Sequence, residues 1–526
     1  MKFKANAVLI DKDMIELDFE IKSTDFFLYK VQSLPSKYYN MKTKTWTTPC
    51  NKVTVEYLKK WGFKLDPKIV KQLQLKDEQP ELIDPKLLLP LRDYQKESLG
   101  FIDSRNGRAL LGLDAGLGKS AVALGWMKYR KKYPTLIVCP ASLKLNWENE
   151  VKKFLGKESV VLYGSPQKSQ RLIGDIIIIN YDILKKWETL LLKKKFELMI
   201  IDESQVTKNS SAQRTKAVLK LSGAIPCVIP MSATSVENGP MDLFTTFKII
   251  NKKLFPNKHQ FGIRYCGAVH NGWGWKYPGA TNIKELIDLL GDVMIRRKKS
   301  DVLKELPDKT RAVVPIELDN RKEYVKCENT FLQWYRMNQG QKVNAMAKME
   351  ALKQLTNKGK FNQIIEWIGN YLESGNKLIV FGIHIDQVES IHKQFKQSVL
   401  LYGKMNSKQK QKSVDDFQND KKIRLMVANI KSGGVGLNLT AAPDTCTIEL
   451  PWNPAILEQA ESRVHRIGQT ADKVTNYYLI APRTIEEDMM STLDAKQKIM
   501  DKILDGVDTP SDDLLTVLIK KMKDRR

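Results

Sequence analysis

Paired cysteines and long apolar segments are both missing from this sequence. Its six cysteines are scattered and form no CxxC pair, so neither a zinc knuckle nor a disulfide framework is predicted. A reducing compartment fits this cysteine usage best. No run of residues is apolar over the length needed to cross a bilayer, and acidic residues interrupt the amino-terminal segment early. We therefore predict a soluble intracellular protein without membrane contact and without intrinsic zinc.

Acidic residues are scarce relative to basic ones. The chain has 60 Asp and Glu against 86 Lys and Arg, which gives a formal net charge of +26. Such an excess favours a polyanionic partner, because contacts to phosphates release condensed counterions. Nucleic acid is the predicted partner. The alternative is a lysine-rich surface that serves only solubility.

Internal repeats and large appendages are also absent from the 526 residues. This compactness favours a bacterial or viral protein in the cytoplasm of its cell or host, and a nuclear location is the expectation for a eukaryote. A chain of this length accommodates about three or four domains. We expect a monomer.

Short apolar runs alternate with helix-like segments in two parts of the chain. In the first part the runs are ALLGL, TLIVCP, DIIIIN, LMIID and CVIPMSAT, and in the second they are KLIVF, SVLLY, RLMVAN, TCTIEL and TNYYLI. Such runs read as buried parallel strands, whose carboxyl ends build a site in open α/β sheets. The sequence predicts an α/β protein with two doubly wound lobes.

The remaining segments divide the chain further. We predict a small α+β module over 1–85, the first lobe over 86–240, a helical insertion and linker over 241–376, the second lobe over 377–488, and a helical tail over 489–526. The insertion contains the aromatic and glycine-rich stretch HNGWGWKYPG, followed by amphipathic, lysine-rich helical sequence.

A glycine-rich turn follows the first apolar run. It reads Leu113-Asp-Ala-Gly116-Leu-Gly118-Lys119-Ser120. In such a turn the backbone N–H groups and the helix start cradle phosphates, the lysine meets their charge and the serine hydroxyl holds Mg²⁺. The strict GxxxxGK[ST] spacing is not kept, because Leu113 stands where the first glycine belongs. A phosphate clamp is predicted, against the alternative of a turn that only caps a helix.

Two arginines in the second lobe complement this loop. Arg463 and Arg466 are three residues apart in QAESRVHRIGQ, on one helix face or the adjoining turn, where both can point at a γ-phosphate. Arginine delivered across a cleft stabilises the charge that develops in phosphoryl transfer. We therefore predict that nucleotide binds between the two lobes.

The order and the residues of these motifs resemble those of the Snf2 family of DNA translocases, within the superfamily 2 helicase-like ATPases. The resemblance runs from about Leu91 to Asp488 and rests on LRDYQ, LDAGLGKS, LIVCPASLKLNWENEVKKF, IIDESQ, MSATSVENG, MIRRKKSDVLKELPDK, KLIVFGIHIDQVESI and VANIKSGGVGLNLTAAPDTCTIELPWNPAILEQAESRVHRIGQT. It implies two tandem RecA-like lobes, ATP and Mg²⁺ as cofactors, and a DNA-dependent ATPase.

The resemblance also assigns roles in the nucleotide site. Asp202 would hold Mg²⁺ through water, together with Ser120, and Glu203 would orient or deprotonate the attacking water. Catalytic roles fall to Lys119, Asp202, Glu203, Arg463 and Arg466. Gln95 would read adenine, and nucleotide binding falls to Arg92, Gln95, Gly116, Leu117, Gly118, Lys119, Ser120 and Gly436.

Contacts to DNA and coupling between the lobes are implied in the same way. The implied DNA contacts are Ser142, Lys144, Asn146, Ser232, Thr234, Ser432, Gly433, Gly434 and Thr440. Small polar residues at strand ends also serve as caps, which is the alternative reading. Coupling falls to Gln459 and to Gln205, which replaces the usual histidine and can still bridge the lobes by hydrogen bonds. This replacement places coupling in more doubt than hydrolysis.

The implied activity is ATP-driven movement along double-stranded or branched DNA by grip on the backbone. The amino-terminal segment resembles the HARP module of annealing helicases, and Lys37, Lys42 and Lys44 lie among Tyr38, Tyr39 and Trp46. These residues would combine attraction to the backbone with base stacking at a junction. The alternative is that Trp46 and one tyrosine only form a small core.

Two rival functions stay open at this point. One is a strand-separating helicase on DNA or RNA, and the other is a DNA-binding scaffold that has lost ATP turnover. Chromatin remodelling is disfavoured, because no histone-reader segment is recognisable.

Overall fold

The computed structural model describes residues 5–11, 13–19, 24–77, 80–167, 170–234, 239–255, 257–270, 272, 274–338, 342–433, 439–504 and 514–525. The chain divides into two compact units. The first comprises Met1–Asp114, Gly118–Val302 and Met500–Ser511, and the second comprises Ala115–Leu117, Leu303–Ile499 and Asp512–Arg526. Among the described residues, no helix is both long and apolar enough to cross a membrane.

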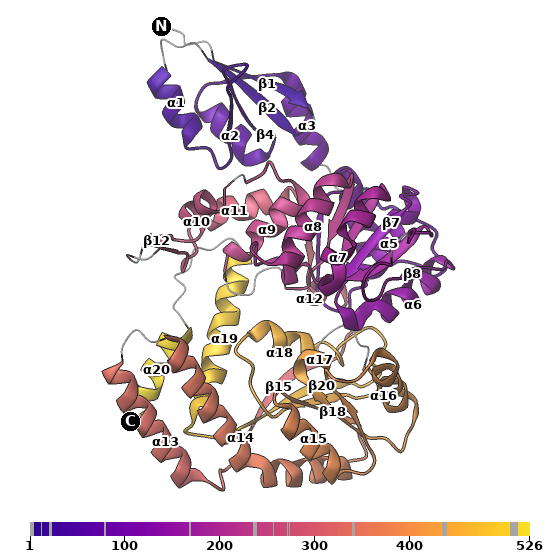
Figure 1. Ribbon diagram of the computed structural model, residues 1–526, viewed down its shortest axis with the longest axis vertical. Coiled ribbons are helices and arrows are strands. Elements are labelled where there is room, and N and C mark those ends of the chain that lie inside the picture. The colour runs from indigo at the N-terminus through magenta and orange to yellow at the C-terminus, as the bar shows by residue number, and fades with distance from the viewer. Residues whose placement is uncertain are drawn as a thin grey trace. The chain divides into compact units, whose positions relative to one another are not determined.

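The amino-terminal part of the first unit is a small α+β module, drawn in indigo in Figure 1. Its sheet has the order β3-β4-β2-β1-β5. The elements are β1 (Ala5–Asp11), β2 (Met14–Phe19), α1 (Thr24–Gln32), β3 (Tyr38–Asn40), β4 (Thr45–Pro49), α2 (Lys52–Lys60), β5 (Lys64–Leu65) and α3 (Pro67–Asp77). Asn51 caps α2, because its side chain accepts a hydrogen bond from Thr54 N at 2.8 Å. Strand alternation buries Ala7, Ile15 and Leu17 in the core of the module.

The first lobe contains the five strands predicted from the apolar runs. They are β6 (Leu110–Leu113), β7 (Thr135–Cys139), β9 (Ile176–Asn180), β10 (Leu198–Ile201) and β11 (Cys227–Pro230), with β8 (Val160–Val161) at one edge. The parallel order is β11-β10-β7-β9-β8, and a bridge between Leu111 and Met231 joins β6 to β11. The helices are α4 (Asp93–Ser104), α5 (Lys119–Tyr129), α6 (Lys144–Leu155), α7 (Tyr181–Lys193) and α8 (Gln213–Ala224). The predicted doubly wound architecture of this lobe is confirmed.

The segment predicted as one insertion and linker is split between the two units after Val302. Its first half holds α9 (Met241–Ile250), α10 (Lys258–Tyr265), β12 (Val269–His270), β13 (Trp275–Lys276), α11 (Ile283–Gly291), β14 (Met294–Arg297) and α12 (Lys299–Val302). Strand β14 pairs in parallel with β6 and so extends the sheet of the first lobe. The second half supplies β15 (Asp308–Pro315), which pairs with β20 of the second lobe. The two halves of the segment predicted over 241–376 therefore contribute edge strands to two different sheets.

The second lobe is a six-stranded parallel sheet of order β15-β20-β19-β16-β18-β17. Its predicted strands are β16 (Leu378–Gly382), β17 (Ser398–Leu401), β18 (Leu425–Asn429), β19 (Asp444–Thr447) and β20 (Lys473–Ile480). The helices are α13 (Arg321–Met337), α14 (Lys342–Glu373), α15 (Ile385–Gln394), α16 (Ser407–Asn419), α17 (Ile430–Gly433), α18 (Pro454–Glu461), α19 (Ile485–Leu504) and α20 (Leu514–Asp524). The segment predicted as a helical tail, 489–526, includes the later part of α19 and all of α20.

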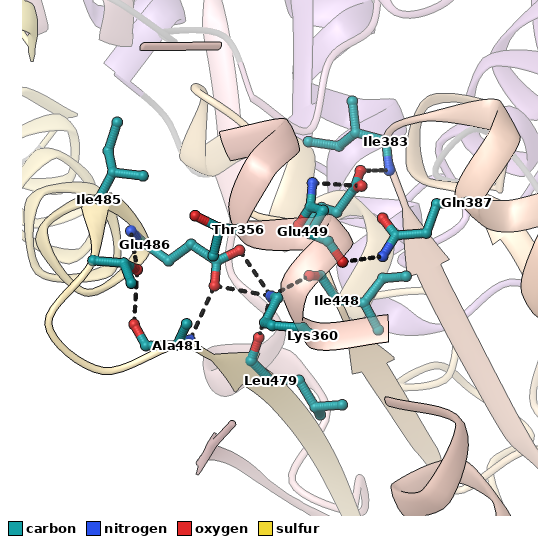
Figure 2. Close-up of polar contacts among 12 residues, drawn as sticks. Thr356, Lys360, Ile383, Gln387, Ile448, Glu449, Leu479, Ala481, Ile485 and Glu486 are labelled. Carbon is teal, nitrogen blue, oxygen red and sulfur yellow. Dashed lines mark hydrogen bonds and ion pairs between the residues drawn. The ribbon is translucent and has the colours of Figure 1, made fainter. Parts of the chain in front are cut away.

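A buried lysine ties three elements of the second lobe together (Figure 2). Lys360 on α14 is 0% exposed, and its amine donates to the carbonyl oxygens of Ile448 and Leu479 at 2.8 Å. The same amine contacts both carboxylate oxygens of Glu486 on α19 at 2.8 Å, and Ala481 N donates to that carboxylate at 3.0 Å. Every donor of the ammonium is used, so the helix, the sheet and α19 are held in one arrangement.

Replacing Lys360 with methionine is expected to lower the free energy of unfolding by about 3–5 kcal/mol, because the Glu486 carboxylate stays buried without its charge partner. Urea denaturation of the full chain measures this. The double variant with Glu486→Leu should recover much of the loss, and Lys358→Met, on the exposed face of the same helix, should change stability little. A Lys360→Met chain as stable as the wild type would contradict this account of the buried pair.

Candidate nucleotide site

The predicted phosphate loop lies between β6 and α5. Gly116 and Gly118 have φ values of +91° and +78°, a region that favours glycine. At Gly118, an added Cβ would lie 2.3 Å from Nε2 of Gln95, so a side chain there would displace the glutamine. The structure therefore brings Gln95, predicted to read adenine, directly against the loop.

Gln95 and Arg92 stand at the start of α4. Gln95 is 7% exposed, and its Oε1 accepts a hydrogen bond from Arg92 N at 2.9 Å. This bond closes the first turn of α4 and orients the amide so that Nε2 faces Gly118. The Arg92 side chain is exposed.

Lys119 lies across the loop at the first position of α5. Its amine donates to the carbonyl oxygens of Leu113 at 2.8 Å and Asp114 at 3.3 Å. Ser120 follows in the first turn of the helix and is half-buried. The amino end of a helix carries partial positive charge and N–H groups without intrahelical partners, so the loop, the helix start and the lysine together suit an anion such as a phosphate.

Asp202 follows β10 and accepts three hydrogen bonds. Its Oδ2 accepts a hydrogen bond from Trp147 Nε1 at 2.9 Å, its Oδ1 accepts one from Glu203 N at 3.0 Å, and its backbone carbonyl accepts one from the Tyr181 hydroxyl at 2.6 Å. Asp202 is 8% exposed. Burial, followed by the neighbouring charge of Glu203, raises its pKa to about 6. A cation beside this carboxylate would favour its charged form.

A chain of side-chain hydrogen bonds leads away from Glu203. The residue has a left-handed backbone with φ of +50°, which turns the chain sharply after the strand. Gln205 Nε2 donates to Glu203 Oε2 at 2.7 Å, and Ser232 Oγ donates to Gln205 Oε1 at 2.7 Å. Thr234 N then donates to Ser232 Oγ at 3.1 Å. Gln205, predicted to bridge the lobes, thus links the ends of β10 and β11 within the first lobe.

The predicted arginine pair lies in the turn after α18. Arg463 is 2% exposed, and its carbonyl accepts a hydrogen bond from Leu439 N at 3.2 Å. Arg466 is half-buried, and its Nε donates to the carbonyl of Ser462 at 2.9 Å. Gln459, the second coupling residue, is half-buried on α18 itself. Backbone contacts within the second unit thus hold this turn.

Two residues predicted to contact DNA have buried side chains. Lys144 is 6% exposed, its amine donates to Leu162 O at 3.0 Å and lies 3.7 Å from the centroid of the Tyr163 ring, and burial lowers its pKa. Ser232 is 1% exposed and its hydroxyl is used in the chain from Gln205. In this structure each of the two side chains is hydrogen-bonded inside the lobe, and their contacts to DNA stay predictions.

The other residues predicted to contact DNA stay predictions. Those with half-buried side chains are Ser142, Asn146, Thr234, Ser432 and Thr440. Gly433 ends α17. Gly434, together with Gly436 of the predicted nucleotide set, lies outside the described residues.

Two residues of the site were missed in the sequence, Trp147 and Tyr181, which hold Asp202. Tyr181 directly follows β9, at the carboxyl end of a strand, and that position was a usable signal. Trp147 lies on α6 and is separated from Asp202 by 55 positions. No local pattern marks it as a partner of a carboxylate.

The hairpin β3–β4 of the amino-terminal module presents aromatic and basic side chains. Tyr39 is 47% exposed, and its ring lies 5.1 Å from that of Trp46, which also packs partly against the core. Lys42 and Lys44 are exposed in the connecting turn. Lys37, by contrast, donates to backbone carbonyls of the module, among them Leu34 O at 3.4 Å. The tryptophan thus has a structural role, while Tyr39 and two of the three lysines face outward.

Comparisons with known proteins give matches over most of the chain. The SNF2-related domain matches residues 94–366, and the Helicase conserved C-terminal domain matches residues 359–468. The Caenorhabditis elegans homolog of the SWI/SNF-related matrix-associated actin-dependent regulator of chromatin subfamily A-like protein 1 is 33% identical, over 91% of this chain and 73% of that protein. The Xenopus tropicalis protein of that name is 31% identical, over 94% of this chain and 55% of its own length.

Two further matches carry names that refer to DNA. DNA annealing helicase and endonuclease ZRANB3 of Homo sapiens is 28% identical over 81% of this chain and 41% of that protein. A solved structure, the Sulfolobus solfataricus SWI2/SNF2 ATPase core in complex with dsDNA, is 26% identical, covers 81% of this chain and 96% of that chain, and has a TM-score of 0.41. This chain spans about half the length of the first curated relatives that it matches.

Proposed function

Because the chain belongs to the Snf2 family of helicase-like ATPases, we propose that it is a DNA-dependent ATPase that moves along double-stranded DNA and remodels or anneals branched DNA. The observation that carries this proposal is the built site of the first lobe. A phosphate loop, the buried Asp202 with its half-buried neighbour Glu203, and a hydrogen-bonded path to the next strand end occur together there.

The site residues suit ATP with Mg²⁺. Asp202 and Ser120 offer carboxylate and hydroxyl oxygens, the hard donors that Mg²⁺ prefers. Each oxygen of the Asp202 carboxylate accepts one protein hydrogen bond, which leaves lone pairs for a water of the metal. Bound Mg²⁺ would neutralise phosphate charge. Lys119 would hold the phosphates, and Glu203 would orient the attacking water or take its proton.

The hydrogen-bonded path suggests how hydrolysis reaches the DNA-binding elements. Glu203, Gln205 and Ser232 connect the hydrolytic carboxylate to the segment after β11, where Thr234 remains a predicted DNA contact. A change at the γ-phosphate that moves Glu203 would move this segment. The replacement of the usual histidine by glutamine keeps a donor and an acceptor at this point.

Replacing Gln205 with alanine is expected to reduce the stimulation of ATP hydrolysis by DNA about 2- to 30-fold, which corresponds to the coupling energies of about 0.5–2 kcal/mol that such networks carry. The rate without DNA should stay near the wild-type value. Gln205→His should restore part of the stimulation, because imidazole can also donate and accept. Equal losses with and without DNA would place Gln205 in hydrolysis itself and contradict a coupling role.

The preference for branched DNA is proposed from the hairpin β3–β4. Tyr39 offers an exposed aromatic face, and Lys42 and Lys44 supply charge beside it. Aromatic faces stack on unpaired bases, which occur at a fork and not in an intact duplex. A relative of this chain bears the name of a DNA annealing helicase.

The test compares ATPase stimulation by single-stranded, duplex and forked DNA, and then repeats the fork with Tyr39→Ala. We expect stimulation by duplex and fork, and a selective loss on the fork for this variant. Tyr29→Ala is the matched control, since Tyr29 is 76% exposed on α1 of the same module. Absence of stimulation by any DNA would favour the DNA-binding scaffold. Displacement of one strand from a tailed duplex would favour the strand-separating helicase.

A further inference from the structure

The insertion of the first lobe contains a long stretch without acidic residues. Positions 251–284 hold no Asp or Glu, but they hold six basic residues, which are Lys252, Lys253, Lys258, Arg264, Lys276 and Lys284. Two histidines and the HNGWGWKYPG stretch fall within the same range. Arg264 pairs with Glu285 and Lys253 pairs with Asp11, so the charge that can attract a polyanion comes from the other lysines of the stretch.

The centre of this stretch is a two-stranded hairpin. Strands β12 and β13 pair antiparallel, with His270 opposite Trp275. Trp275 is 48% exposed and Val269 is 55% exposed. The indole lies 4.5 Å from the His259 ring and 5.3 Å from the His270 ring, measured between centroids. A large aromatic side chain is thus held at the surface beside two imidazoles.

The base of the hairpin is packed closely against α10. A Cβ added at Gly262 of α10 would lie 2.1 Å from Cε1 of Tyr277, so the tyrosine ring rests directly on the helix backbone. The backbones at Gly267 and Gly279 also touch, since a Cβ at Gly267 would lie 3.2 Å from Cα of Gly279. Gly279 N donates to Cys266 O at 2.9 Å. The base of the hairpin is thus closely packed, and Trp275 stays half-exposed above it.

This combination matches the requirements for stacking a nucleobase. Successive bases stack on aromatic side chains in proteins that bind single strands, and nearby basic residues track the backbone. Both His259 and His270 contact the ring. Lys258, which precedes His259, and Lys276, which follows Trp275, are exposed. In an intact duplex the base faces are covered by their neighbours, so only an unpaired base can use the indole.

We propose that the β12–β13 hairpin is a second nucleic-acid site, which stacks an unpaired base of branched DNA on Trp275. The proposal rests on the proposed function and names a contact that is separate from both the nucleotide site and the hairpin β3–β4. The ligand is the single-stranded segment at a junction. Lys276, the neighbour of Trp275 in the chain and opposite Val269 in the hairpin, supplies positive charge that attracts the phosphates of the bound strand.

The first experiment measures the affinity of the full chain for a fork with a single-stranded arm and for a blunt duplex of equal length. Trp275→Ala should weaken fork binding about 10-fold, as alanine substitution of stacking residues does, and leave duplex affinity and duplex-stimulated hydrolysis unchanged. Trp275→Phe should retain most of the affinity, because it keeps an aromatic face. The control is Tyr129→Ala, a 41% exposed tyrosine on α5.

Unchanged fork affinity in Trp275→Ala, or equal losses on fork and duplex, would overturn the proposal. A Trp275→Ala chain that fails to fold is replaced by Lys276→Ala, whose fork affinity should fall less steeply with salt than that of the wild type. A salt dependence equal to that of the wild type would also overturn the proposal.

The second experiment is photocrosslinking with 5-iodouracil in the single-stranded arm. We expect a crosslink in the peptide that contains Trp275, and its loss in Trp275→Ala. A crosslink without any DNA-stimulated hydrolysis would refute the proposed motor function and keep the binding site. Stimulated hydrolysis with crosslinks only elsewhere would keep the motor function and refute the hairpin site.

Discussion

Replacing Arg466 with alanine is expected to lower DNA-stimulated ATP hydrolysis about 10³- to 10⁵-fold, the contribution of an arginine finger in phosphoryl transfer. The guanidinium would stabilise charge on the γ-phosphoryl oxygens in the transition state, so the loss should appear in kcat. Steady-state hydrolysis with saturating duplex DNA measures it. ATP affinity should change far less, because the ground state carries less of this charge.

The control for this variant is Arg321→Ala. Arg321 forms an ion pair with Glu317 at 3.3 Å on the same unit, and a partly exposed pair of this kind contributes little. Arg466→Lys should recover only a small part of the rate, since an ammonium does not reproduce the planar fork of donors. A rate for Arg466→Ala within about threefold of the wild type, well below any arginine-finger effect, would remove this residue from the hydrolytic step.

Replacing Glu203 with glutamine is expected to slow hydrolysis about 10²- to 10⁴-fold, the usual contribution of a positioned general base. The amide cannot take a proton from water, but its oxygen can still accept the hydrogen bond that Gln205 Nε2 donates to Glu203 at 2.7 Å. The chain should therefore bind ATP and DNA together and stall before hydrolysis. Single-turnover hydrolysis and nucleotide binding separate these steps.

Glu197→Gln serves as the matched control. Glu197 precedes β10, and its side chain is 46% exposed and pairs with Lys132 at 3.4 Å. Its replacement should leave hydrolysis unchanged. Loss of ATP binding in Glu203→Gln, in place of slow hydrolysis, would show that the residue supports the site structurally and does not serve as the base.

The phosphate loop shows which structural features a local sequence pattern can predict. Gly116, Gly118 and Lys119 are neighbours in the sequence, and the spacing alone predicts a turn followed by a helix, as the structure has it. The same holds for the apolar runs that became the strands of both sheets. Such features depend on a few adjacent residues, whose backbone preferences and burial repeat in every protein that uses them.

Lys144 and Ser232 show what a local pattern leaves out. Both occupy positions that suggest a contact to DNA, yet Leu162 O accepts the lysine amine and Gln205 Oε1 accepts the serine hydroxyl. A polar side chain goes wherever its hydrogen bonds can be satisfied, and a buried partner supplied by another strand cannot be read from the neighbours. The edge strands β14 and β15 were missed for the same reason, since their partners lie elsewhere in the chain.

By itself, the sequence determined the two α/β lobes, the loop that suits phosphate and the carboxylate pair after β10, because these depend on short-range spacing and periodic burial. Only the tertiary structure decided which side chains support them. Trp147 meets Asp202 across 55 positions, and Lys360 meets Glu486 across 126. Such pairs form because a buried polar group without a partner costs free energy, and burial exists only once the chain has closed around the group.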